Sequence, residues 1–317
     1  MTQYNKAVLA RMAKKWGFVR DTFEKVVRLG EVLTFFNTES FFQNHLCLKG
    51  GTAINLTIFE MPRLSVDIDM DYVSNDSLED LKQNRQEIAD KLRSYMERNG
   101  YVLSPASRFH HTLDAFQYDY VNAGGNKDMI KIELNYSLRA HIFEPVIGKI
   151  LIDTFGEGVS VRTLAPMEIF AAKANALVNR TAARDLYDFN RMIELHLFAD
   201  QMDMFRKCII FYHSITADTI DSAFSVSSID SLDFSKIRRD LFPVIKDKAQ
   251  FDLEKCKKQA QEYLVNLMNL NDLEKAYLDF FSKGEYRPEL LFEDEKIIER
   301  IKAHPMALWK CKNNIDN

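Results

Sequence analysis

The chain has 317 residues, with 42 Lys and Arg against 46 Asp and Glu, which gives a formal net charge of −4. Its hydrophobic fraction of 46% and charged fraction of 28% are ordinary for globular proteins, so a disordered chain, a collagen-like repeat and a simple coiled coil are excluded. The near-neutral balance argues against a protein that coats nucleic acid by bulk charge, and it leaves local basic patches open.

The cysteines and the N-terminus indicate a cytoplasmic protein. The four cysteines, at positions 47, 208, 256 and 311, are too widely spaced for a zinc site or a disulfide framework. Lysines and arginines interrupt the N-terminal stretch, and nowhere does an apolar run reach the roughly 18 residues of a membrane span. We therefore expect reduced thiols and no membrane contact.

The N-terminal part of the chain is predicted to form helices, a strand, a turn and a second strand. Apolar residues recur at three- and four-residue steps over residues 4–44, which predicts helices. The apolar run at 45–49 predicts a strand that enters a tight turn at Gly50-Gly51, and Thr52 is expected to be the N-cap of a short helix. Alternation from Leu64 to Val73 predicts a half-buried strand.

The rest of the chain divides into a second mixed segment and a helical half. Residues 78–98 have the pattern of a charged amphipathic helix, and segments 111–121 and 129–138 are predicted strands joined by a hairpin turn. Pro166 is expected to begin a helix, and the chain is nearly all helical from there on. These patterns predict an α+β fold with a boundary near residues 160–200.

Asp67 and Asp69 form the strongest constellation of reactive side chains. Because alternate residues of a strand share one face, both carboxylates project from the same side. A divalent cation would relieve their repulsion, although the spacing alone fits a solvated acidic face as well. Glu133 lies on another predicted strand beside Lys131, and it is either a third carboxylate of a two-metal site or an exposed residue paired with lysine.

Two further features of the sequence have the chemistry to bind phosphate groups. Gly50-Gly51-Thr52 lies where a strand meets a helix, so its backbone can approach an anion, although an ordinary turn looks the same. In the helical half, three cations fall on one face of a predicted unbroken helix: Lys173, Arg180 and Arg184. They can bind a polyphosphate or pair with the nearby Asp185 and Asp188.

A local excess of positive charge stands further along the helical half. Residues 236–258 contain eight lysines and arginines against four acidic residues. Such an excess is typical of a surface that engages an RNA backbone, and equally of a solvated helix face.

Together, these segments resemble the nucleotidyltransferase AbiEii/AbiGii toxin family, a branch of the polymerase-β-like nucleotidyltransferases. The resemblance spans roughly residues 20–195 and is carried, in order, by Leu48-Lys49-Gly50-Gly51-Thr52-Ala53, Arg63-Leu64-Ser65-Val66-Asp67-Ile68-Asp69, Lys131-Ile132-Glu133-Leu134, 164–173 and Arg184-Asp185-Leu186-Tyr187-Asp188. It implies a small mixed β-sheet nucleotidyltransferase core with flanking helices. The expected domains are residues 1–195 (helices about 4–44, core about 45–165, active-site helix about 166–195) and a helical domain, 196–317, that binds acceptor or partner.

The resemblance also implies roles for the matching positions. Asp67 and Asp69 correspond to the metal-binding pair, and Glu133 occupies the place of a third carboxylate, where related enzymes often have Asp. Glutamate is longer, so one- and two-metal mechanisms both stay open, and Asp71 is a further acid that can compete as a ligand. Contacts with the nucleotide are implied for Lys49, Gly50, Gly51, Thr52, Ser65, Lys173, Arg180 and Arg184. Lys173 is similar to the family's catalytic lysine, and either Asp185 or Asp188 matches its final acidic motif.

These implications predict an enzyme that transfers NMP from an NTP to an acceptor, with Mg²⁺ or Mn²⁺ as the metal. By resemblance, the acceptor is expected to be RNA, above all the 3′ end of tRNA, and the protein to be the toxin of a toxin–antitoxin or abortive-infection system with a cognate antitoxin. Two alternatives stay open: transfer to a protein or small molecule, and a catalytically silent nucleotide-binding or partner-binding module.

Overall fold

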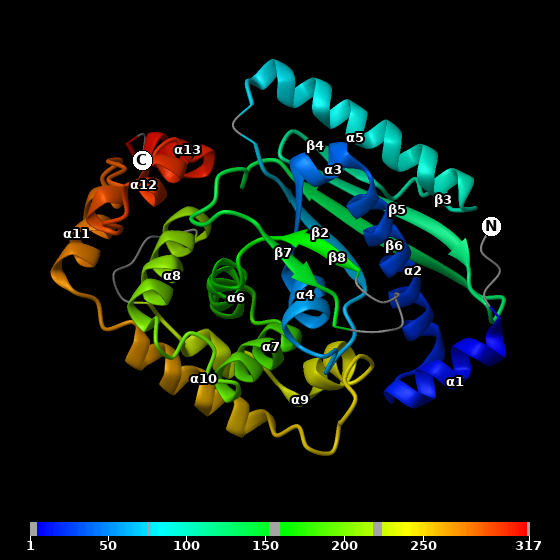
Figure 1. The fold of residues 1–317 in the computed structure, drawn as a ribbon. Helices are drawn as coiled ribbons and strands as arrows, with labels where there is room; N and C mark the ends of the chain where they lie inside the picture. The colour runs from blue at the N-terminus through cyan, green and yellow to red at the C-terminus, as the bar shows by residue number, and fades with distance from the viewer. Residues whose placement is uncertain (1–4, 75, 152–158, 218–223, 316–317) are drawn as a thin grey trace. The chain divides into compact units, whose positions relative to one another are not determined.

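The computed structural model describes residues 5–74, 76–151, 159–217 and 224–315 (Figure 1). The chain forms two compact units. Unit 1 consists of Met1–Arg139, Pro145–Thr163 and Pro243–Asp247, and unit 2 consists of Ala140–Glu144, Leu164–Phe242 and Lys248–Asn317. The α+β class predicted from the sequence is confirmed, because unit 1 contains one mixed sheet with flanking helices and the regular elements of unit 2 are helical.

The sheet of unit 1 runs in the order β3-β5-β6-β2-β1-β8-β7, with β4 also paired to β5. Its strands are β1 (Leu46–Lys49), β2 (Asp67–Tyr72), β3 (Val102–Leu103), β4 (Arg108–His110), β5 (Leu113–Val121), β6 (Lys127–Asn135), β7 (Val146–Lys149) and β8 (Ser160–Thr163). The predicted strands became β1, β2, β5 and β6, with β5 and β6 as the expected hairpin. The other four strands are too short for a periodic pattern to reveal them.

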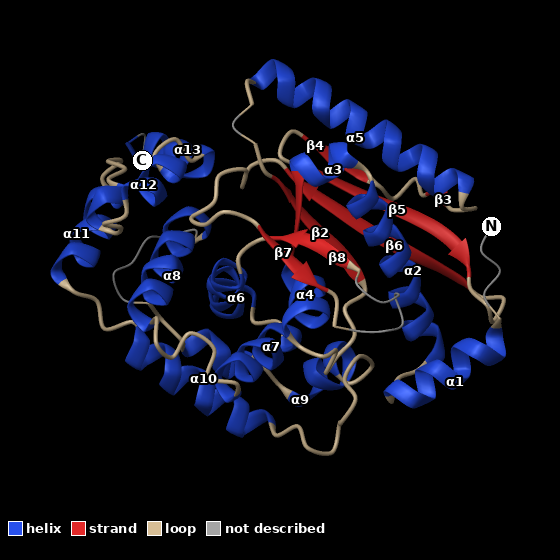
Figure 2. Cartoon of the chain, viewed as in Figure 1, coloured by secondary structure: helices blue, strands red, loops and turns tan. Residues whose placement is uncertain are grey.

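The long helices of unit 1 cover one face of this sheet, and the turn at Gly50 packs on the other face against Asp69 (Figure 2). The helices of unit 1 are α1 (Lys6–Trp16), α2 (Arg20–Thr38), α3 (Ser40–His45), α4 (Gly50–Ala53), the π-helical η1 (Ile54–Ile58) and α5 (Leu78–Arg98). Figure 2 shows α2 and α5 lying across the sheet, and the side chains on that face are buried: Ile68, Met70, Phe116, Tyr118, Ile130, Ile132 and Leu134. Alternation then directs Asp67, Asp69 and Glu133 to the opposite face.

The helix after β1 begins earlier than predicted. Lys49 is its N-cap, and Gly50 with φ +67° opens α4, which continues into η1. The expectation that Thr52 caps this helix is therefore wrong. Thr52 is buried within the first turn, where its hydroxyl donates to the main-chain carbonyl of Asp67. A tertiary partner for the hydroxyl replaces the local N–H that a capping residue would use.

Unit 2 is built from helices. They are α6 (Pro166–Arg180), α7 (Ala183–Glu194), α8 (Met202–Thr216), η3 (Ser227–Ser231), α9 (Phe234–Lys236), η4 (Ile237–Leu241), α10 (Leu253–Leu267), α11 (Asp272–Ser282), η5 (Pro288–Leu290), α12 (Glu295–Ile301) and α13 (Pro305–Ile315). The expected boundary between residues 195 and 196 falls inside this unit, because α6 packs on α8 and α7 packs on α10. No helix in the described part of the chain is long and apolar enough to cross a membrane.

Candidate active site

The pairing of β2 with β6 brings acidic side chains together on the face of the sheet opposite α2 and α5. The two strands are parallel, and their register places Asp69 beside Glu133 and Asp67 beside Lys131. These strands are separated by about sixty residues of chain, so only the tertiary fold sets this register. The predicted condition for a third carboxylate, that its strand lies next to that of Asp67 and Asp69, is met.

The carboxyl of Asp69 has a strongly perturbed acidity. Burial raises its pKa, the nearby Lys49 ammonium lowers it, and the negative charges of Asp67 and Glu133 raise it again, to about 6. A carboxyl with so high a pKa lies in a site that disfavours further negative charge. A cation bound beside Asp69 would stabilise the ionised form of its carboxyl.

Lys131 is a member of this group that the sequence identified only as a neighbour of Glu133. Its ammonium lies 2.8 Å from a carboxylate oxygen of Glu133. Burial alone would lower the pKa of Lys131, but the bond to Glu133 and the charges of Asp67 and Asp69 raise it. Glu133 is thus held between a lysine and Asp69, and Lys131 supplies permanent positive charge to the acidic face.

We expect the acidity of Asp69 to make the stability of unit 1 depend on pH. Folding raises the pKa of this carboxyl from 3.8 to about 6, so the folded state retains a proton that the unfolded chain releases. The free energy of unfolding should therefore fall as the pH rises from about 4 to about 6. Urea unfolding in EDTA checks this against Asp69→Asn. An equal pH dependence in both proteins would contradict it.

The two glycines of the predicted phosphate turn are packed against side chains of the protein itself. A Cβ added to Gly50 would lie 2.7 Å from an Asp69 carboxylate oxygen. A Cβ on Gly51 would lie 2.6 Å from the guanidinium of Arg63 and 2.9 Å from the Ser65 hydroxyl. Glycine is therefore needed here for close approach of the strand that carries the acids, whatever else the turn binds.

Lys49 and Asp71 form an ion pair next to these acids. The Lys49 ammonium bonds the Asp71 carboxylate, which is almost completely buried. On β1, Lys49 also pairs in register with Asp69. Asp71 is committed to a lysine, so it is a poorer candidate for a metal ligand than its position on β2 suggested.

In unit 2, Lys173 joins both acids of the final motif. Its ammonium, only 7% exposed, lies 2.9 Å from Asp185 and 2.9 Å from Asp188. Arg180 adds a bond of 2.7 Å to Asp185. Burial would raise the pKa of Asp185, but the Lys173 and Arg180 charges more than offset it and hold that pKa well below its usual range. Both motif acids therefore contact the lysine.

The unbroken helix expected to carry the three cations does not form. Thr181 adopts a left-handed conformation with φ +47° and ends α6, and α7 begins anew at Ala183. Lys173 and Arg180 thus lie on one helix and Arg184 on the next. Arg180 still reaches Asp185, because the turn brings the start of α7 back alongside the end of α6.

The acids on β2 suit a divalent cation, although no group of three or more His, Cys, Asp or Glu side chains is arranged to hold a metal among the residues described. Asp67 and Asp69 supply hard oxygen donors of the kind that Mg²⁺ prefers. Burial is the main cause of the raised pKa of Asp69, repulsion by Asp67 and Glu133 adds to it, and a bound cation would oppose both effects. Glu133 fits less directly, since Lys131 holds its carboxylate.

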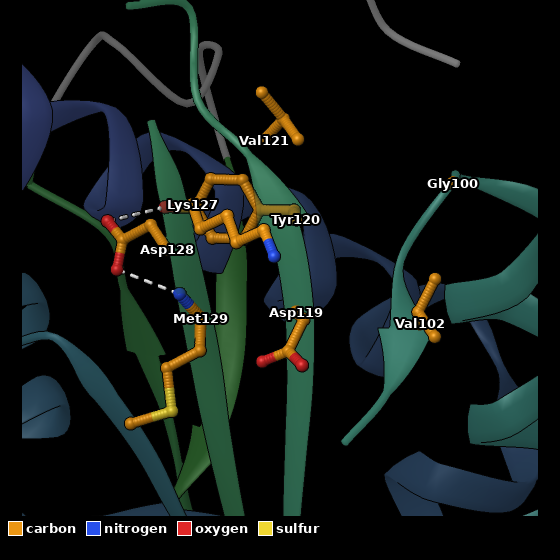
Figure 3. A pocket seen from close by; sticks show the side chains of 8 residues that line it. All are labelled: Gly100, Val102, Asp119, Tyr120, Val121, Lys127, Asp128 and Met129. Atoms are coloured by element: carbon orange, nitrogen blue, oxygen red, sulfur yellow. Dashed lines mark hydrogen bonds between the residues drawn. The ribbon is translucent and has the colours of Figure 1, made fainter. Parts of the chain in front are cut away.

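A hollow of about 590 Å³ lies elsewhere on unit 1 and contains none of the predicted residues (Figure 3). It is lined by Gly100, Val102, Asp119, Tyr120, Val121, Lys127, Asp128 and Met129. The Asp128 carboxylate is committed within the protein, to the Tyr120 hydroxyl, the Met129 amide and the Lys25 ammonium. The hollow thus shares β6 with the predicted acidic site but contains none of that site's residues.

Comparison with known proteins identifies a matching family and a solved structure with a similar fold. A family model described as the nucleotidyl transferase AbiEii toxin of type IV toxin–antitoxin systems matches residues 33–290. Among solved structures, MenT4, a nucleotidyltransferase toxin from Mycobacterium tuberculosis H37Rv, has a TM-score of 0.61 at 16% identity over 96% of this chain and 99% of its own. At that identity the likeness shows a shared fold. No curated protein gives a significant sequence match.

Proposed function

Because the chain belongs to the AbiEii family of nucleotidyltransferase toxins from type IV toxin–antitoxin systems, we propose that it transfers a nucleoside monophosphate from an NTP to an RNA acceptor, above all tRNA. The observation that carries the proposal is the register of β2 and β6, which pairs Asp69 with Glu133 and Asp67 with Lys131, so that three acids share one sheet face. Membership of the family also implies an NTP substrate and an antitoxin partner.

Asp67 and Asp69 are the residues that would hold Mg²⁺. When bound, this ion neutralises phosphate charge and polarises the phosphoryl group. The protein's own contribution is to fix the two carboxylates: Thr52 bonds the main chain of Asp67, and Gly50 lets Asp69 pack directly on the turn. A rigid pair of acids costs no reorganisation when the nucleotide arrives.

Other side chains are proposed to accept the proton and to stabilise the leaving group. The attacking hydroxyl of the acceptor forms a new bond to the α-phosphorus, the bond to pyrophosphate breaks, and Glu133 is proposed to accept the hydroxyl proton. Lys131, bonded to Glu133, would keep that carboxylate oriented. Lys173 and Arg180 are proposed to stabilise the charge on the leaving pyrophosphate, with Asp185 and Asp188 orienting Lys173. Lys49, Gly51 and Ser65 are proposed to contact the triphosphate.

The test is to incubate the full-length protein with each α-³²P-labelled NTP, Mg²⁺ and total tRNA, and to separate RNA from protein on a gel. We expect label in RNA with one pyrophosphate released per nucleotide added, and none in EDTA. Label in a protein band would replace the RNA acceptor by a protein. Nucleotide binding without pyrophosphate release on any acceptor would contradict transferase activity on these acceptors.

Gly50→Ala is expected to reduce transfer about 100-fold, because displacing a catalytic group by an ångström can cost that much. The added Cβ would lie 2.7 Å from the Asp69 carboxylate, and φ +67° strains any residue with a side chain. Initial rates at saturating NTP and RNA measure the effect.

Gly125→Ala is the matched control for this change. Gly125 also has a positive φ, +87°, but a Cβ there meets nothing within 4 Å. It should lose about as much stability from backbone strain, roughly 1–2 kcal/mol, and keep its transfer rate. Equal rates in the two variants would show that contact with Asp69 does not matter.

A further inference from the structure

A chain of aromatic rings runs over one side of unit 2. The ring centroids of Phe234 and Phe242 are 5.5 Å apart, those of Phe242 and Phe251 are 6.4 Å apart, and those of Phe251 and Tyr187 are 6.3 Å apart. Rings this close to one another usually belong to a core, yet Phe234 is 57% exposed. The Phe234 ring, at one end of this chain, is therefore largely exposed on the protein surface.

Two arginines stand one helical turn from rings of this chain. Arg238 is exposed and stands one turn after Phe234 in the continuous helical segment formed by α9 and η4, while Ile237 and Leu241 of that segment are buried. Arg184 is on α7, one turn before Tyr187. Within the described ranges, neither Arg184 nor Arg238 makes an ion pair or a side-chain hydrogen bond, so both charges are available to a ligand.

The acid Asp240 lies near several cations of this group. Asp240 is bonded to Arg239, which lowers its pKa, and the charges of Arg184 and Lys236 lower it further. One acid is thus shared by three cations. Within the 236–258 tract, the other lysines are partly used inside the protein: Lys257 bonds Glu254 and the Asp230 carbonyl, and Lys258 pairs with Glu262.

We propose that Arg184, Tyr187, Phe234, Arg238, Phe242 and Phe251, here called the aromatic–basic surface, bind a single-stranded stretch of nucleic acid. Unpaired arginines supply contacts to phosphates, and an exposed ring supplies a platform on which an unstacked base can lie. A duplex keeps its bases stacked inside and could not use Phe234 in this way, and an acidic peptide would need the cations without the rings.

This inference extends the proposed function by giving the acceptor a docking place. Helix α7 directs Asp185 and Asp188 inward to Lys173, while Arg184 and Tyr187 lie on its outer side. A bound strand would therefore lie about one helix diameter, 10–12 Å, from that ion cluster.

The test measures the binding of a fluorescein-labelled 15-nucleotide RNA to the full-length protein by anisotropy, in EDTA and without NTP. Stacking on one ring contributes about 1–3 kcal/mol, so Phe234→Ala should weaken binding between about 5-fold and 150-fold, and Phe234→Trp should retain it. Arg238→Gln should lower the slope of log affinity against log salt by about 0.7. Asp67→Asn should bind like wild type, which separates this inference from the transfer chemistry.

Two matched controls lie on α13. Trp309 is 57% exposed like Phe234, and Lys312 is exposed, so Trp309→Ala and Lys312→Gln should bind RNA normally. The proposal is overturned if wild type does not bind RNA at low salt, if Phe234→Ala and Arg238→Gln bind as wild type, or if the controls lose as much. It is also overturned if a blunt RNA duplex or polyglutamate displaces the probe as well as unlabelled single strand does.

Discussion

Replacing Asp67 with Asn is expected to lower nucleotidyl transfer about 1,000-fold or more without unfolding the protein. Loss of an outer partner of a metal ligand already costs about 10–100-fold in affinity or activity, and a ligand itself should cost more. The amide has the shape of the carboxylate but lacks its charge. The contact that anchors this residue, from Thr52, reaches its main-chain carbonyl and is untouched.

The measurement is the rate of NMP incorporation into RNA, with Mg²⁺ titrated for each variant. Asp119→Asn is the control, because Asp119 is an exposed acid of β5 on the same sheet face and takes no part in the proposed chemistry. Transfer should be unchanged in that variant. Labelling that persists undiminished in an Asp67→Ala, Asp69→Ala double variant would refute the assignment of the acids.

Lys173→Met is expected to destabilise unit 2 by about 3–5 kcal/mol, the usual cost of leaving one member of a buried ion pair without its partner. Asp185 is 2% exposed and Asp188 is fully buried, and both would lose an ammonium at 2.9 Å. Arg180 would still support Asp185, so most of the cost should come from Asp188.

Urea unfolding, with hydrogen exchange of α6 and α7 as a local readout, measures this effect. Lys283→Met is the control: its pair with Asp279 is as close, 2.7 Å, but exposed on both sides, and should contribute less than about 1 kcal/mol. The neutral triple variant Lys173→Met, Asp185→Asn, Asp188→Asn should recover much of the loss. Equal stability of Lys173→Met and Lys283→Met would refute the buried cluster.

These stability measurements also bear on how a transfer defect at Lys173 is interpreted. The sequence resemblance assigns this lysine to the nucleotide, whereas the structure shows its ammonium held by two acids of its own unit. A defect that survives in the stabilised triple variant would come from loss of the Lys173–Asp185–Asp188 cluster rather than from unfolding.

The alternation over β2 was enough to predict which side chains share its face, because a strand has only two faces and apolar residues take the buried one. Helix α5 was predicted from 78 to 98 and forms there, since its amphipathic pattern begins directly after Ser77, which caps it. Local chemistry was sufficient at these positions. It was also sufficient to identify the family, because the motifs are short and contiguous.

No comparable pattern in the sequence predicts the break between α6 and α7. Neither Gly nor Pro occurs near Thr181, and a β-branched residue is a poor choice for a positive φ. The contacts of Lys173 and Arg180 with Asp185, formed across the turn, supply the compensation, and no local pattern encodes them. The same holds for Thr52, whose hydroxyl found a partner fifteen residues away.

The sequence by itself therefore determined which reactive groups are available: paired aspartates on a strand, a glycine turn and a helical lysine. Its net charge of −4 also showed that any contact with nucleic acid must be local. Only the tertiary structure decided which of them meet. The parallel register of β2 and β6 selects Glu133 and Lys131 as neighbours of the aspartates, and rings from α7, α9 and the 242–251 segment come together in one chain of aromatic contacts. Such contacts join residues distant in the chain, and their energies depend on burial and charge, which short sequence patterns do not specify.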